Sequence, residues 1–284
     1  MRIRVTATVV SGAIVVSALA LPAVAQAAER PDARASLGAF TASSVHPHTK
    51  LGSMTFSKAV INGGKDIDLG TTTKKTVTVT YTATSSSGVA LTEAFLWQGT
   101  DSSSTDTITG SLGTDDDPAC TESTTRTGVY SCKAVFHLDA ASDLKNNGSA
   151  GTWKLFLGGY DLYANASYDD DVATTRIKKT SQLTLDATPE PVKKGKTISV
   201  DGKLRRADWN HGTYTGYTGQ KVLLQYRKKS SSTYTTLKTV TSGTGGALKT
   251  TTKATADGYY RFSFATSTTT AASTSAGDYV HVLP

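Results

Sequence analysis

Short runs in which apolar and polar residues alternate extend along most of the chain. Val77, Val79, Tyr81 and Ala83 alternate with threonines, so one face of this segment is apolar and the other carries hydroxyl groups. A period of two residues is typical of a β-strand with one buried face. The same pattern predicts further strands at residues 130–138, 153–157, 183–185, 198–200, 222–226 and 260–264.

Turn-forming stretches separate these runs. Residues 85–88 are three serines and a glycine, and residues 242–246 read Ser-Gly-Thr-Gly-Gly. Only residues 140–146 fit a short helical turn. Many short strands joined by Gly-rich turns are typical of sandwiches and barrels. We therefore expect an all-β protein with two tandem immunoglobulin-like β-sandwich domains after a signal peptide.

The two predicted domains meet near residue 180. The first covers residues 51–180 and the second covers residues 181–284. The second has about 100 residues and six or seven candidate strands, which is the size of an immunoglobulin-like sandwich.

Hydroxyl side chains dominate the polar positions. The 284 residues include 48 Thr and 29 Ser, whereas only 19% are charged. Disordered chains usually have high charge and few β-branched residues, so this composition argues against disorder. Threonine favours strands, and we expect it on their outward faces.

Residues 1–27 have the features of a secretory signal peptide. Arg2 and Arg4 precede an uncharged apolar stretch, and Ala25-Gln26-Ala27 offers a small-x-small cleavage site. Residues 28–50 lack periodicity and are predicted to be a flexible N-terminal arm. We expect the mature protein to be secreted and extracellular, with no membrane span.

Two cysteines in an exported chain favour a disulfide. Cys120 and Cys132 lie 12 positions apart on either side of a turn-like segment. Closing so short a loop stabilises the fold by about 3 kcal/mol in the chain-entropy model.

The net charge of +7 is unevenly divided. Residues 28–180 hold 14 Lys and Arg against 17 Asp and Glu, a net −3, whereas residues 181–284 hold 14 against 6, a net +8. An anionic cell-wall polymer or glycan is therefore a candidate partner, whereas nucleic acid is disfavoured because no stacking platform alternates with these charges. The alternative is a basic face that only keeps the protein soluble. The predicted basic patch comprises Lys193, Lys194, Lys196, Arg205, Arg206, Arg227, Lys228 and Lys229.

Acidic loops in the first domain are candidate ligands for Ca²⁺, which prefers six to eight oxygen atoms. Three consecutive aspartates cannot all point inward, however, and the Asp-x-Asp-x-Asp-Gly loop is absent. A solvated acidic surface is the alternative. The candidate ligands are Asp101, Asp106, Asp115, Asp116, Asp117, Asp169, Asp170 and Asp171.

Aromatic residues crowd residues 207–220 of the second domain, where Trp209, His211, Tyr214 and Tyr217 lie between two predicted strands. Exposed rings beside polar groups are suited to stacking on sugars, so a carbohydrate-binding module is a second possible function. The alternative is that the rings fold back to order a long loop.

Motifs of catalysis are missing from the sequence. It has no Gly-x-Ser-x-Gly elbow, no His-Glu-x-x-His pair and no phosphate-binding glycine loop. His137 and His281 fall on the polar sides of their strands. We therefore expect no enzyme and no required cofactor, with Ca²⁺ as the one candidate ion.

Five segments resemble a group of secreted actinobacterial proteins of unknown function. They are residues 1–27, 60–67 (Val-Ile-Asn-Gly-Gly-Lys-Asp-Ile), 96–101 (Leu-Trp-Gln-Gly-Thr-Asp), 189–197 (Pro-Glu-Pro-Val-Lys-Lys-Gly-Lys-Thr) and 276–280 (Ala-Gly-Asp-Tyr-Val). The resemblance implies immunoglobulin-like sandwiches and an extracellular location. Some members of the group carry a calcium-binding label, and the group supplies no catalytic residue.

These observations together predict a secreted, non-catalytic binding or structural protein that acts at or near the cell envelope. Its second domain would make the contact. The partner, the oligomeric state and the role of calcium stay open at this point.

Overall fold

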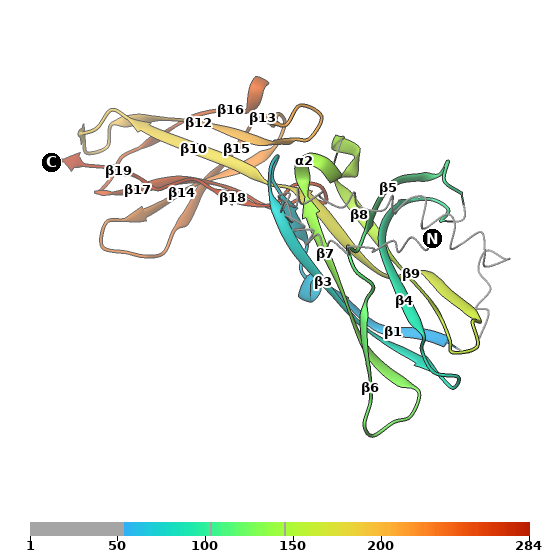
Figure 1. The fold of residues 1–284 in the computed structure, drawn as a ribbon. Coiled ribbons are helices and arrows are strands. Elements are labelled where there is room, and N and C mark those ends of the chain that lie inside the picture. The colour runs from blue at the N-terminus through green and yellow to red at the C-terminus, as the bar shows by residue number, and fades with distance from the viewer. Residues whose placement is uncertain (1–53, 103, 145) are drawn as a thin grey trace, which may run out of the picture.

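The computed structural model describes residues 54–102, 104–144 and 146–284. The predicted signal peptide, the predicted arm and residues 51–53 lie outside the described residues. In the described part the protein is all-β, as predicted, and it forms two immunoglobulin-like sandwiches with separate apolar cores (Figure 1).

The first sandwich packs a four-stranded sheet against a five-stranded one. The four-stranded sheet has the order β1 (Met54–Ile61), β3 (Lys74–Ser85), β7 (Val129–Asp139), β6 (Ala119–Glu122). The five-stranded sheet has the order β2 (Ile67–Leu69), β9 (Ala166–Lys179), β8 (Gly151–Tyr160), β4 (Leu91–Gly99), β5 (Ile108–Gly113).

This arrangement matches the ABED sheet and the opposing CFG-type sheet of the immunoglobulin fold. The alternation in β3 has the predicted result: Val77, Val79, Tyr81 and Ala83 are all buried in the core between the sheets. The short helix α2 (Ala140–Asp143) follows β7, within the segment where a helical turn was predicted.

A second apolar cluster lies on the other face of the five-stranded sheet. Phe95, Trp97, Phe156 and Tyr168 are buried there, on positions that alternate with the core residues of β4 and β8. Strands β4 and β8 are therefore buried on both faces.

The second sandwich also consists of two main sheets. In one, β12 (Thr197–Asp208) pairs with β10 (Ser181–Thr188) and also with β13 (Thr213–Gly216) and β16 (Ala247–Lys253). The other has the order β15 (Thr235–Thr241), β14 (Lys221–Lys228), β17 (Gly258–Phe264), and β17 also pairs with β18 (Ser273–Thr274) and β19 (Asp278–Val280). A short parallel pair joins β11 (Val192–Lys193) to β20 (Val282–Leu283).

The predicted disulfide between Cys120 and Cys132 is present, with an S–S distance of 2.03 Å. The two cysteines face each other on β6 and β7, which are neighbours in one sheet. The bond therefore fastens the edge strand β6 to its own sheet and does not join the two sheets of the sandwich.

The chain passes from the first sandwich into the second with Thr180 alone between β9 and β10. The backbone of Lys179 also pairs with a loop of the second sandwich: its N–H donates to the Thr269 carbonyl at 3.0 Å, and its carbonyl accepts from Ala271 at 2.8 Å. The second sandwich extends at an angle from one end of the first, and the C-terminus lies at its remote end (Figure 1). We call this remote end the far end and the contact between the sandwiches the junction.

Candidate functional site

The eight aspartates proposed as calcium ligands lie in three segments of the first sandwich. Two of these segments come together, because Ser102, beside Asp101, donates a hydrogen bond of 2.7 Å from its hydroxyl to the carboxylate of Asp170. In the third segment, Asp115 Oδ2 is 2.8 Å from Nδ1 of His137 on β7, a strand of the four-stranded sheet. Among the described residues, no three side chains of His, Cys, Asp or Glu are grouped to hold a metal ion. Calcium binding therefore stays a prediction from the sequence.

Trp209 corrects the prediction of an exposed aromatic platform. Only 6% of the residue is exposed, and its indole N–H donates to the backbone carbonyl of Gly70 at 2.8 Å. Gly70 belongs to the first sandwich, so this ring fills the junction. Tyr214 lies beside it and shares a hydrogen bond of 2.7 Å with the hydroxyl of Thr180. Both rings pack against the core of the first sandwich, Trp209 buried and Tyr214 half-buried.

The other two members of the predicted aromatic site are also held by the protein. The Tyr217 ring packs edge-on against Phe264 with a centroid distance of 5.8 Å, and the guanidinium carbon of Arg206 lies 4.0 Å from its centre. His211 is exposed, and its Nδ1 is 3.0 Å from Asp208 Oδ2. The hydrogen bond from His211 is the main reason that the pKa of Asp208 lies below its usual value. The region therefore differs from both interpretations of the sequence, because Trp209 and Tyr214 pack against the first sandwich and do not fold back on their own loop.

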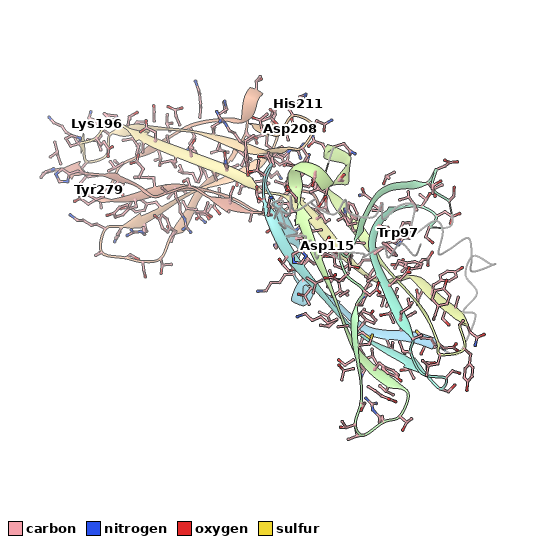
Figure 2. The ribbon with its side chains drawn as sticks, viewed as in Figure 1. Trp97, Asp115, Lys196, Asp208, His211 and Tyr279 are labelled. Atoms are coloured by element: carbon pink, nitrogen blue, oxygen red, sulfur yellow. A yellow bond between two sulfur atoms is a disulfide. The ribbon has the colours of Figure 1, made fainter. Side chains whose placement is uncertain are left out.

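The eight predicted basic residues do not form one patch. Arg205 and Arg206 lie at the junction end of β12, whereas Lys196 lies just before the other end of this strand. Strands rise about 3.3 Å per residue, so ten residues of strand separate these charges by about 33 Å. Lys196 accordingly lies at the far end, and Asp208 and His211 lie beside the first sandwich (Figure 2). Arg227 takes a third position, on the outer face of β14.

Five of the eight predicted cations do come together at the far end. The turn after β11 is fixed there by two backbone hydrogen bonds, from Lys194 N–H to Leu283 at 2.8 Å and from Gly195 N–H to Ala254 at 2.7 Å. Lys229, just after β14, donates its backbone N–H to Asp257 at the same end. Thr197 pairs with Lys253, which adds a sixth lysine. We call this set the lysine end; its exposed members are Lys193, Lys194, Lys196, Lys228, Lys229 and Lys253.

Asp257 is the carboxylate placed among these lysines. It accepts hydrogen bonds from the backbone N–H of Val282 at 2.7 Å and from the hydroxyl of Tyr279 at 2.9 Å, and His281 Nδ1 lies 3.2 Å away. These hydrogen bonds lower the pKa of Asp257, and the bond from Val282 has the largest effect. The interaction of Lys229 itself with the Tyr279 hydroxyl raises the pKa of Lys229, and the charge of Asp257 adds to this. Asp257, beside Lys229, is therefore already occupied by groups of the protein, and Glu190, Asp186 and Asp278 are further acids whose charges interact with one another near this end.

A row of tyrosines and arginines adjoins the lysine end on the outer face of the sheet β15-β14-β17-β19. Arg227 on β14 lies opposite Tyr259 on β17, and Tyr259 lies opposite Tyr279 on β19. Arg261 follows two positions after Tyr259 on the same face. We call this set the outer-face row, and it comprises Arg227, Tyr234, Tyr259, Arg261 and Tyr279, all of them half-buried.

Sequence reasoning missed most of this row. Tyr259 and Arg261 occupy the positions that alternate with the buried Tyr260 and Phe262. That alternation could have placed Tyr259 and Arg261 together on the outer face of the strand. It could not show that Arg227 lies beside Tyr259, because this depends on the register between β14 and β17.

Comparison with known proteins gives no family for this chain. No known family model matches it. No curated protein matches it in sequence. In the described residues no helix is long and apolar enough to cross a membrane.

Solved structures with similar chains are built of immunoglobulin-like and adhesin domains. The Yersinia pseudotuberculosis adhesin InvE is 14% identical with a TM-score of 0.27, and the alignment covers 81% of this chain and 60% of that one. The mouse nectin-like molecule 4 ectodomain is 12% identical with a TM-score of 0.24, and the alignment covers 82% of this chain and 67% of that one. Three N-terminal domains of the bacteriophage RB49 Highly Immunogenic Outer Capsid protein are 12% identical with a TM-score of 0.33, and the alignment covers 81% of this chain and 71% of that one. Likeness at this level concerns the fold alone, and this chain spans about three fifths of the adhesin.

Proposed function

We propose that this protein is a secreted, non-catalytic binding protein that holds an anionic polymer of the cell envelope at the lysine end of its second sandwich. The observation that carries this proposal is the gathering of six exposed lysines, from three separate segments of the chain, at one end of the molecule. Clustered like charges repel one another, and a polyanion relieves that repulsion.

The junction supports this function because it fixes where the lysine end points. Trp209, Tyr214 and the backbone of Lys179 tie the second sandwich to the first over several independent contacts. A basic end held away from the body of the protein can reach a polymer without contact from the first sandwich.

Retention on purified cell walls across a salt series tests the proposal. Exposed charges are screened over about 10 Å at 0.1 M salt, so binding by the lysine end should weaken steeply as salt rises. The variant Lys193→Gln, Lys194→Gln, Lys196→Gln should bind walls more weakly and with less dependence on salt.

A matched control removes the same charge elsewhere. Lys58, Lys65 and Lys133 are exposed on the first sandwich, and replacing all three with Gln gives the same net charge as the test variant. We expect this control to bind like the wild type. Equal loss in both variants would show that net charge alone drives retention, and unchanged binding in the test variant would refute a role for the lysine end.

A further inference from the structure

The outer-face row holds its two arginines in fixed positions. The guanidinium carbon of Arg261 lies 3.7 Å from the centre of the Tyr234 ring, and that of Arg227 lies 3.9 Å from the centre of the Tyr259 ring. Arg227 also lies 5.4 Å from the centre of the Tyr234 ring, so this ring has one guanidinium close to it and a second nearby. The Tyr259 and Tyr279 rings are 5.1 Å apart between centroids and continue the row. Cations that lie over aromatic faces are stabilised by the ring electrons.

One hydrogen bond fixes the rotation of each guanidinium. Arg227 Nη1 donates to the carbonyl of Ser231 at 2.9 Å, and Arg261 Nε donates to Gln225 Oε1 at 2.8 Å. A guanidinium carries five N–H donors. In the described part of the chain each of these arginines therefore keeps four donors for water or a ligand.

Neither arginine is paired with an acid among the described residues, whose salt bridges all lie elsewhere. Asp257, the carboxylate that binds Tyr279 of the row, is also held by Val282 and lies 3.2 Å from His281. Two oriented, uncompensated guanidiniums at a half-buried surface suit a ligand with oxyanions. Arginine binds phosphate and carboxylate through paired N–H donors, a geometry that lysine cannot reproduce.

Orientation before binding is the second property of this row. Long cationic side chains usually lose rotamer freedom when they bind a ligand, which weakens binding. The stacking on Tyr234 and Tyr259 removes much of that freedom in the unbound protein. Gly277 preserves this packing, because a Cβ at this position would collide with the hydroxyl of Tyr234.

We propose that Arg227 and Arg261, held by Tyr234 and Tyr259, form the oxyanion-recognition site of the protein and bind phosphate or carboxylate groups along a linear anionic polymer. This inference rests on the proposed function. In it the lysine end supplies attraction that depends only on charge, whereas the outer-face row selects groups with paired oxygen atoms. The row borders the lysine end, so one polymer chain can contact both.

A charge-preserving variant of the full mature chain tests this site. Arg227→Lys with Arg261→Lys keeps the net charge but removes the paired donors and the planar stacking. We expect its affinity for a synthetic glycerol-phosphate oligomer, measured by calorimetry, to fall at least fivefold while the salt dependence stays that of the wild type. The control Arg205→Lys changes an exposed arginine at the junction end and should bind like the wild type.

Two further variants separate recognition from folding. Tyr234→Phe keeps the ring and should keep the affinity, whereas Gly277→Ala should displace the ring and lower the affinity with both arginines intact. Circular dichroism and the melting temperature check that each variant is folded. Repeating the titration with an oligogalacturonate, which carries carboxylates in place of phosphates, shows which group is bound. The site is supported if the wild type binds either oligomer and the variant Arg227→Lys, Arg261→Lys binds it more weakly.

The outcomes separate the two proposals. Suppose that the variant Arg227→Lys, Arg261→Lys binds both oligomers like the wild type, while the Gln variant of the lysine end loses wall binding. The proposed oxyanion site is then wrong and the proposed function stands. If the Gln variant binds walls normally, the proposed function fails. If the arginine variant changes only self-association in analytical ultracentrifugation, the row is a contact between copies of this chain and the oxyanion site is refuted.

Discussion

Removing the Trp209 ring should loosen the junction between the sandwiches. The ring is 6% exposed, and aromatic side chains of this size bury about 200 Å². At about 25 cal/mol per Å² this burial is worth about 5 kcal/mol as an upper estimate, and truncations of buried aromatic rings to Ala cost about 3–5 kcal/mol. We therefore expect Trp209→Ala to lower the free energy of unfolding by about 3–5 kcal/mol.

A second substitution divides this loss between packing and hydrogen bonding. Trp209→Phe keeps an aromatic ring but removes the N–H that donates to Gly70. An acceptor left without its partner in a buried place costs about 1–3 kcal/mol, so this variant should lie between the wild type and Trp209→Ala. Tyr163→Ala, which truncates a ring that is 78% exposed in the first sandwich, is the control and should change stability by less than about 0.5 kcal/mol.

Urea denaturation followed by two probes measures the effect. Fluorescence comes from Trp97 and Trp153 of the first sandwich, joined in the wild type by Trp209 at the junction, and far-UV circular dichroism reports on both sandwiches. The midpoints from the two probes should lie further apart in Trp209→Ala than in the wild type, since the sandwiches then unfold with less coupling. Small-angle scattering should show a broader range of shapes. A variant within about 1 kcal/mol of the wild type, with unchanged scattering, would refute a structural role for this ring.

Three further predictions concern the cores and the junction. Burial lowers the pKa of Lys179 to about 8, so between that value and 10.5 the unfolded chain binds more protons and stability should rise with pH. Lys179→Met should be more stable than the wild type at pH 7, by at most about 3 kcal/mol, with the difference in urea unfolding closing towards pH 10.5, and a difference that is constant with pH would contradict this account. Replacing Cys120 and Cys132 with Ser should cost about 3 kcal/mol of stability in urea, and the wild type in reductant should match the variant. Gly70→Ala would place a Cβ 2.8 Å from the Tyr214 hydroxyl, and we expect a loss of about 1–3 kcal/mol by the same assay, with no loss indicating that the junction yields freely.

Strands with one apolar and one polar face could be predicted because their signal is local. In β3, β7 and β17 apolar and polar residues alternate, and burial of one face requires only that the opposite sheet be apolar as well. The same signal does not find β4, which is buried on both faces, or the short strands β2 and β6.

The functional surfaces could be predicted only in part because they depend on register and on distant partners. Trp209 looks like a loop residue free to bind sugar until Gly70, 139 positions away, accepts its N–H. Arg205 is close to Lys196 in sequence, but the extended strand β12 places the two at opposite ends of the sandwich. The outer-face row likewise requires that β14, β17 and β19 be aligned before Arg227 meets Tyr259.

The parallel pairs in the two sandwiches determine how the molecule responds to tension between residue 54 and the C-terminus. In the first sandwich β2 lies parallel to β9, which leads into the junction, and in the second β11 lies parallel to β20, which ends the chain. A pull along the molecule slides the strands of each pair past each other, so their hydrogen bonds share the load instead of opening one at a time. The rate of forced unfolding depends on that barrier. A protein with this arrangement of strands is suited to stay folded while its two ends are drawn apart.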